Sequence, residues 1–187
     1  VSEADSAPPP QRWANRTPQD SEQLFRAMFM NAPICILIHD GETGEMLEAN
    51  PTACVQYGYD SFESLKANFD RIWLEPPYSI NDAIQWNIKA IEVGPQQFEW
   101  CYRHADGRLQ WEWVHLSTLV MHGRVCILAM TVDITSEKQI RSALQASEAR
   151  ARAIVDASPV PFVLTNTQDD IVYLNSAFTR FFGYTLE

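Results

Sequence analysis

Runs of alternating apolar and polar residues predict β-strands in two groups along the chain. Residues 34–39 are apolar and β-branched, and residues 45–49 return as a second strand after a DGETG turn. Three longer strand-like runs come much later, and turn signals containing glycine separate them. These later runs cover 96–104, 109–120 and 124–133. The pattern therefore predicts two early strands and three late ones.

Helices are predicted ahead of the strands and between the two groups. Asn50 and Pro51 are typical of an N-cap and a first helical residue, and Gly58 supplies a left-handed C-cap. The segment 79–93 carries isoleucines at helical spacing, and we expect this stripe to face the core. The stripe consists of Ile84, Ile88 and Ile91. The other predicted helices cover 21–30, 61–65 and 70–74.

This order of elements predicts the fold class. Sequential antiparallel strands with helices gathered between them are typical of an α+β domain. The strands are too apolar for both faces of the sheet to be wet. We therefore expect a five-stranded antiparallel sheet with helices covering one face.

The opening of this domain is repeated near the end of the chain. Asn31-Ala32-Pro33 is echoed by Ala157-Ser158-Pro159, and in both copies an asparagine lies eight residues before a glycine. These pairs are Asn50 with Gly58 and Asn175 with Gly183. The repeat indicates a tandem duplication whose second copy holds only two strands and one helix. That copy is expected to lack a sheet core of its own.

These patterns divide the chain into four segments. The first is Pro-rich and polar, so we expect it to be disordered or extended. The segments are the tail 1–20, the main domain 21–135 with its N-terminal helix, the helical linker 136–156, and the truncated second copy 157–187.

The linker is expected to be a helix with a dimer seam. Residues 136–156 contain neither Gly nor Pro and are rich in helix-forming residues. Their apolar positions follow a soft heptad, which favours a marginal parallel coiled coil over a lone helix packed on its own domain. The seam consists of Ile140, Leu144, Ser147, Ala151 and Ile154.

Several motifs resemble the PAS family in its bacterial form with a trailing PAC segment. The resemblance covers residues 22–135 and again 148–187, and it implies a PAS fold with a sensory or interaction role. The motifs are the Asn-Ala-Pro opening, Asn50 heading a helix that ends in Tyr57-Gly58-Tyr59, the turn Arg103-His104-Ala105-Asp106-Gly107 followed by Trp111, and Asp133-Ile134-Thr135.

The last of these motifs joins the domain to the linker. Thr135 can cap the following helix, while Asp133 ends the last strand. The resemblance implies that this junction passes movements of the sheet to the linker, and simple capping is the alternative.

Composition limits the partners that we expect. A formal net charge of −10 and the lack of a basic stripe argue against nucleic acid. No apolar run approaches the roughly 20 residues of a membrane-spanning helix, and no signal peptide is present. The chain starts at Val1, so we interpret it as a fragment of a longer protein. We expect a homodimer formed through the N-terminal helix, the linker or both, and a downstream output domain.

The sequence offers no catalytic constellation. The four histidines lie on or beside strands without a nucleophile at suitable spacing, and no phosphate loop or metal-ligand motif occurs. The cysteines are scattered, and each lies in an apolar or strand-like stretch, as buried free thiols do. They are Cys35, Cys54, Cys101 and Cys126. We expect no enzyme and no metal site in this fragment, and a reducing, cytoplasmic compartment.

The family resemblance also bears on cofactors. Haem-binding members take a histidine from the long helix, and 79–93 contains none. Covalent flavin needs a cysteine motif that this chain lacks. A non-covalent flavin, or a small apolar or acidic ligand, stays open.

The candidate ligand site lies on the inner face of the sheet. The family register would place Phe98, Trp100 and Tyr102 there, with Val114 and Leu116 opposite; alternation alone would also allow Trp111 and Trp113 to face Trp100. A core filled by these side chains is the alternative to a cavity. The predicted cofactor-binding residues are Ile72, Trp86, Ile88, Phe98, Trp100, Val114, Leu116, Ile127 and Ala129.

The expected function is therefore signal transduction. We predict a sensory PAS module that relays ligand or partner binding through the linker, with a histidine kinase as output. The alternatives are a diguanylate cyclase or phosphodiesterase output, and a ligand-free interaction domain.

Overall fold

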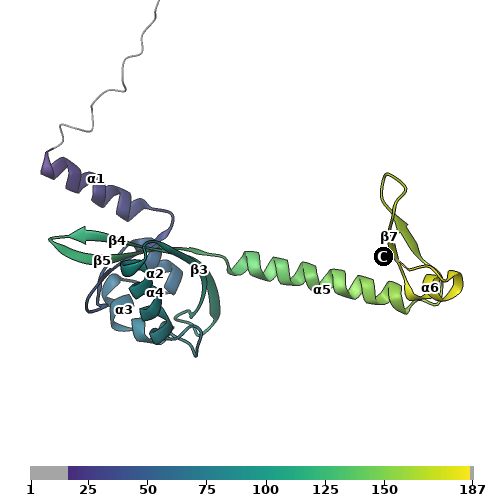
Figure 1. Ribbon diagram of the computed structural model, residues 1–187. Coiled ribbons are helices and arrows are strands. Elements are labelled where there is room, and N and C mark those ends of the chain that lie inside the picture. Colours follow the sequence, from purple (N-terminus) through teal and green to yellow (C-terminus); the bar gives the residue numbers. More distant parts are fainter. Residues whose placement is uncertain (1–16, 186–187) are drawn as a thin grey trace, which may run out of the picture. The chain divides into compact units, whose positions relative to one another are not determined.

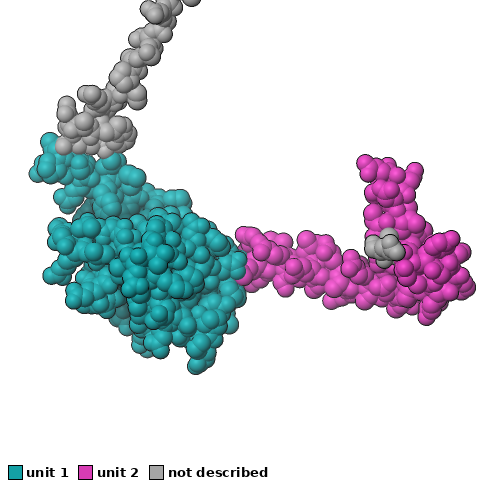
Figure 2. Space-filling view, viewed as in Figure 1, with its two compact units in different colours: residues 1–135 teal, residues 136–187 magenta. Residues whose placement is uncertain are grey.

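The computed structural model describes residues 17–185. The chain forms two compact units, residues 1–135 and 136–187, which are coloured separately in Figure 2. Most of the predicted tail, residues 1–16, lies outside the described residues.

The first unit contains the predicted five-stranded antiparallel sheet, and the α+β fold class is confirmed. Strand order is β2-β1-β5-β4-β3, so the late strands pair onto the early hairpin through β5. The strands are β1 (Cys35–Asp40), β2 (Met46–Ala49), β3 (Gln96–Arg103), β4 (Leu109–Met121) and β5 (Arg124–Asp133).

The helices between the strand groups cover one face of this sheet (Figure 1). They enclose the main core, in which Leu65, Ile72 and Ala90 pack against the strands. These helices are α2 (Pro51–Tyr57), α3 (Phe62–Ala67), the 3-10 helix η1 (Phe69–Ile72) and α4 (Ile80–Glu92).

Helix α1 (Pro18–Asn31) precedes the sheet and begins earlier than predicted. It starts at Pro18 because Thr17 and Asp20 form a reciprocal capping box, a signal that the tail interpretation of residues 1–20 missed. Only Phe29 is buried, against Ile38 and Cys126 on the sheet face opposite the main core.

Helix α2 is fixed by a buried asparagine, as the sequence predicts. Asn50 accepts hydrogen bonds from the N–H groups of Ala53 and Ile36 at 2.9 and 3.0 Å. Its amide also donates to the carbonyl oxygen of Ile34 at 2.9 Å. Every polar atom of this side chain is therefore satisfied locally, which ties the helix start to β1.

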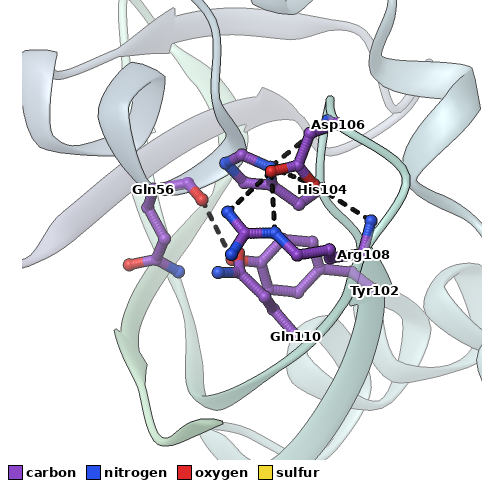
Figure 3. A network of polar contacts seen from close by, with 6 residues as sticks. All are labelled: Gln56, Tyr102, His104, Asp106, Arg108 and Gln110. Atoms are coloured by element: carbon purple, nitrogen blue, oxygen red, sulfur yellow. Dashed lines mark hydrogen bonds and ion pairs between the residues drawn. The ribbon is translucent and has the colours of Figure 1, made fainter. Parts of the chain in front are cut away.

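The other end of α2 is held by the turn between β3 and β4. Gly58 has a φ of +83°, and a Cβ at this position would lie 2.4 Å from Nε2 of His104. The N–H of Ala105 donates to the Tyr57 carbonyl at 3.0 Å. Figure 3 shows that His104 belongs to a polar network in which Asp106 binds Arg108, Nε to Oδ2, at 2.8 Å.

Helix α4 corrects the predicted core face. Its buried side is formed by Ala83, Trp86 and Ala90, because small residues let the backbone approach the sheet while Trp86 stacks on Phe98. The isoleucine stripe lies about one residue further around the helix and is largely exposed, although Ile84 at its edge still lines the space between α4 and the sheet. Exposed fractions are 45% for Ile84, 39% for Ile88 and 43% for Ile91.

The second unit repeats the opening of the first. Asn175 is buried, accepts hydrogen bonds from Phe162 and Phe178, and donates to Val160, in the pattern that Asn50 follows. Strand β6 pairs only with β7 among the described strands, and the apolar residues of both lack a covering layer. The elements are α5 (Thr135–Ala157), β6 (Val163–Thr165), β7 (Ile171–Leu174) and α6 (Ser176–Phe182).

Candidate functional site

A cavity of about 290 Å³, partly open to solvent, lies in the first unit between the inner face of the sheet and the helices that cover it. Of the nine residues predicted from the sequence, eight line this cavity: Ile72, Trp86, Phe98, Trp100, Val114, Leu116, Ile127 and Ala129. Ile88 does not, because the position of α4 turns it to the outer side of that helix.

The register of β3 and β4 places these side chains together. Phe98 lies opposite Val114 and Gln96 opposite Leu116, so Val114 and Leu116 face inward, as the family register predicted. Trp113 is turned to the opposite face and is 42% exposed.

Aromatic rings form much of the cavity wall. Trp86 and Phe98 are stacked, with centroids 4.1 Å apart and an interplanar angle of 14°. Trp73 meets Trp100 edge to face at 6.3 Å, and Phe69 meets Trp73 in the same way at 5.4 Å. Such contacts fix the orientation of the rings, and they stabilise the wall by more than the burial of their apolar area alone.

A buried carboxyl group also lines the cavity. Glu112 lies opposite Trp100 in the register and is 3% exposed. The Tyr57 hydroxyl donates to its Oε2 at 3.0 Å, and Gln56 Nε2 donates to the same oxygen at 2.8 Å. Gln56 Nε2 also lies 2.8 Å from Thr131 Oγ1. The carboxyl group is thus held from α2 on one side and from β5 on the other.

Burial raises the pKa of Glu112 to about 7, because the charged form loses its hydration. Hydrogen bonds from Thr131, Tyr57 and Gln56 oppose this rise, and the negative charge of Asp133 adds to it. The carboxyl group therefore changes charge near neutral pH.

Neighbouring groups keep their protons in this range. Burial, followed by the charge of Glu112, raises the pKa values of the Cys35 thiol and of the Tyr57 and Tyr102 hydroxyls. Within this cluster the titration near neutral pH accordingly belongs to Glu112.

A histidine also lines the cavity. The Nδ1 atom of His39 lies 3.2 Å from the carbonyl oxygen of Gly44 and must donate to it, because a carbonyl only accepts. Burial lowers the pKa of His39, so the ring is neutral and Nε2 is left as an acceptor.

The residue next to Glu112 holds the start of α5. The N–H of Trp111 donates to Thr135 Oγ1 at 2.8 Å, and the Trp111 carbonyl accepts from the Ile134 N–H at 2.9 Å. Asp133 Oδ1 accepts from the Thr135 N–H at 2.7 Å. Glu112, which lines the cavity, and Trp111, which binds the junction, are therefore adjacent residues of β4.

Sequence reasoning missed Glu112, His39 and Tyr57 as cavity residues. A usable signal existed for Glu112, because strand alternation that turns Val114 and Leu116 inward must also turn Glu112 inward. Tyr57 was interpreted only as part of a family motif.

Within residues 17–185, no group of three or more His, Cys, Asp or Glu side chains could hold a metal ion. Nor does this part of the chain contain a helix long and apolar enough to cross a membrane.

Comparisons with known proteins agree on one family. The PAS domain family model matches residues 23–92 and 149–187, more than half of the chain and parts of both copies. A comparison with curated proteins returns no match.

Solved structures resemble the chain as well. The PAS domain of an HTR-like protein from Haloarcula marismortui is 26% identical, with a TM-score of 0.53 over 62% of this chain and 93% of that one. A PAS domain from Colwellia psychrerythraea is 20% identical, with a TM-score of 0.52 over 63% and 99%. An RNA-binding Light-Oxygen-Voltage receptor is 24% identical, with a TM-score of 0.57 over 75% of this chain and 40% of that one.

The raised pKa of Glu112 predicts how stability depends on pH. The folded state holds its proton to about pH 7, whereas the unfolded chain releases it near the ordinary value of 4.5. The free energy of unfolding should therefore fall as pH rises between these values. The Glu112→Gln variant should lack this contribution, a difference approaching roughly 1.4 kcal/mol per pH unit.

Urea denaturation at a series of pH values measures this slope. The Glu48→Gln variant, which alters an exposed carboxyl group on β2, should keep the wild-type profile. Parallel profiles for wild type and Glu112→Gln would show that Glu112 is ionised throughout and that its assigned pKa is wrong.

Proposed function

Because the chain belongs to the PAS domain family, we propose that its first unit is a sensory module that binds a small ligand in the cavity and relays binding through the Asp133–Thr135 junction into α5. The observation that carries this proposal is the shared stretch of β4, where Glu112 lines the cavity and Trp111 holds the junction.

The size of the cavity supports a ligand over a filled core. Protein interiors are close-packed and contain few voids larger than a water molecule. A volume of about 290 Å³ is well beyond such a defect and lies near the lower end of the range for ligand pockets, about 300 Å³.

The backbone contacts of Trp111 support a relay. A ligand that displaces Glu112 must strain β4, because neighbouring residues of a strand move together. Trp111 is bound to the junction by both its N–H and its carbonyl group, so a shift of β4 changes the geometry at the first residue of α5.

The lining of the cavity supports non-covalent binding. None of the described residues that line it is a cysteine, and all four cysteines of the chain are buried free thiols, as expected. Helix α4 contains no histidine that could serve as an axial haem ligand.

We further propose a homodimer with the heptad seam of α5 as its interface. No residue of α5 is buried in the single chain, and 70% of Ile140, 58% of Leu144 and 66% of Ile154 are exposed. Pairing with a second copy of α5 would cover the apolar stripe of this 23-residue helix and stabilise it. Exposed Phe25 and Met28 on α1 form the competing interface.

The output of the parent protein is proposed from the family resemblance alone. A histidine kinase is the first choice, and a diguanylate cyclase or phosphodiesterase is the alternative. The gene sequence that encodes the parent protein distinguishes these outputs.

The relay predicts that filling the cavity changes α5. Ala129→Leu adds bulk to the cavity lining and should alter amide hydrogen exchange of residues 134–140 by at least about threefold, a size typical of local stability changes. The change should be smaller when Thr135→Val also removes the hydroxyl that binds Trp111.

Mass spectrometry of exchanged peptides provides the readout, and urea denaturation checks that each variant folds. Val120→Leu, on an exposed part of β4, is the control and should leave 134–140 unchanged. If Ala129→Leu altered exchange in the sheet alone, cavity and linker would be uncoupled and the relay would be wrong.

The dimer seam predicts that a charge at Leu144 weakens association. Leu144→Glu would bury an unpaired carboxylate between two helices, and we expect the dimer dissociation constant to rise at least about tenfold. Ser142→Glu adds the same charge about 200° around the helix and should leave association unchanged.

Sedimentation equilibrium of the three proteins measures the effect, and circular dichroism confirms folding. A wild-type monomer contradicts the dimer. An unchanged dimer in Leu144→Glu contradicts the seam and assigns the interface to α1.

A further inference from the structure

The charged groups of the cavity all have one sign. Of the described residues that line it, Asp70 and Glu112 are acidic, and none is Lys or Arg. Asp133 lies close enough to Glu112 to raise its pKa by charge repulsion. Among these lining residues an anionic ligand would find no Lys or Arg to pair with, and it would lie next to a group that ionises near neutral pH.

Glu112 has acceptor capacity left for a ligand. An ionised carboxylate offers about four lone-pair sites. Three protein donors act on it, from Tyr57, Gln56 and Thr131. The Tyr57 hydroxyl lies 3.2 Å from Oε1 and 3.0 Å from Oε2 but has one hydrogen to donate, so these donors supply hydrogens for three of the four sites of a group that lines the cavity. Because a carboxylate only accepts, it selects a ligand that donates a hydrogen bond.

His39, one of the other polar residues of the lining, selects in the same direction. With Nδ1 of His39 committed to the Gly44 carbonyl, Nε2 can only accept. Histidine and carboxylate together therefore present acceptors to the cavity.

The remaining wall suits an aromatic ring beside a cation. Phe69, Trp73 and Trp100 line the cavity with rings that can stack on another ring and whose faces attract positive charge. The volume of about 290 Å³ is roughly twice that of an engineered protein cavity of about 150 Å³ that holds benzene. A two-ring group of indole size fits this space.

We propose that the cavity binds a small aromatic ammonium compound, whose ring lies between the aromatic walls and whose ammonium group pairs with the Glu112 carboxylate. This proposal rests on the proposed ligand-binding function and narrows it to one chemical class. Acidic ligands, including phosphate-bearing flavins, are disfavoured by the same groups.

The pairing makes binding depend on pH in a defined direction. The titratable groups facing Glu112 are Cys35, Tyr57 and Tyr102, which stay neutral, and Asp133, whose negative charge adds to the attraction of a cation. Below about pH 7 an ammonium ligand must displace the proton of Glu112, so affinity should fall about tenfold per pH unit. A neutral ligand releases no proton and should show no such dependence.

Three probes of equal ring size and different charge test the proposal: tryptamine, indole and indole-3-acetate. Isothermal titration calorimetry of the full chain at about pH 8 should give affinity in that order, with tryptamine at least about tenfold tighter than indole. Glu112→Gln should remove this advantage, so that tryptamine and indole bind the variant with equal affinity. Glu48→Gln, an exposed carboxyl variant, should bind all three like wild type.

Wild type alone provides a second test, which holds even if Glu112→Gln does not fold. Between about pH 8 and pH 6 tryptamine should lose affinity about tenfold, while indole should not. Indole-3-acetate binding as tightly as tryptamine, or tryptamine binding equally well to Glu112→Gln, would overturn the ligand class and leave the ligand-binding function standing. Failure of all three probes to bind would likewise overturn the ligand class.

Discussion

The hydrogen bonds between helix α2 and the Glu112 carboxyl group connect the parts of this domain that matter for sensing. Tyr57 and Gln56 of α2 donate hydrogen bonds to the carboxyl group of Glu112, a residue of β4 whose side chain is buried. A buried carboxyl group without such donors would cost several kcal/mol. The position of α2 therefore depends on Glu112, and the protonation of Glu112 depends on α2.

The ends of α2 explain why this arrangement is rigid. Asn50 ties its start to β1, and Gly58 brings its end so close to His104 that no larger residue fits. With both ends fixed, a change at Glu112 is poorly absorbed by the helix. In the proposed relay the change acts instead on β4, whose Trp111 holds the first residue of α5 at Thr135.

Much of this could be predicted from the sequence, because the signals are local. Strand alternation, the Asn50 cap and the glycine turns depend on a few neighbouring residues, and they predicted the sheet. The lining residues on the strands followed from the register that the family resemblance implied, because alternation alone also allowed Trp111 and Trp113 to face Trp100. The core-facing side of α4 was predicted wrongly because the apolar stripe around Ile88 is a stronger sequence signal than a small residue such as Ala90. A small residue indicates close packing only when the partner that packs against it is known. Glu112 was missed because its burial depends on donors from a distant helix, although its phase with Val114 pointed inward.

Difference infrared spectroscopy of wild type against Glu112→Gln tests most directly whether a protonated carboxyl group in the cavity senses a cation. The carbonyl band of the protonated acid should persist up to a midpoint of about pH 7. At a pH about one unit lower, saturating tryptamine should remove this band, because a paired carboxylate carries no proton. A band that disappears near the ordinary glutamate pKa of about 4.5, or one that tryptamine leaves unchanged, would contradict the account.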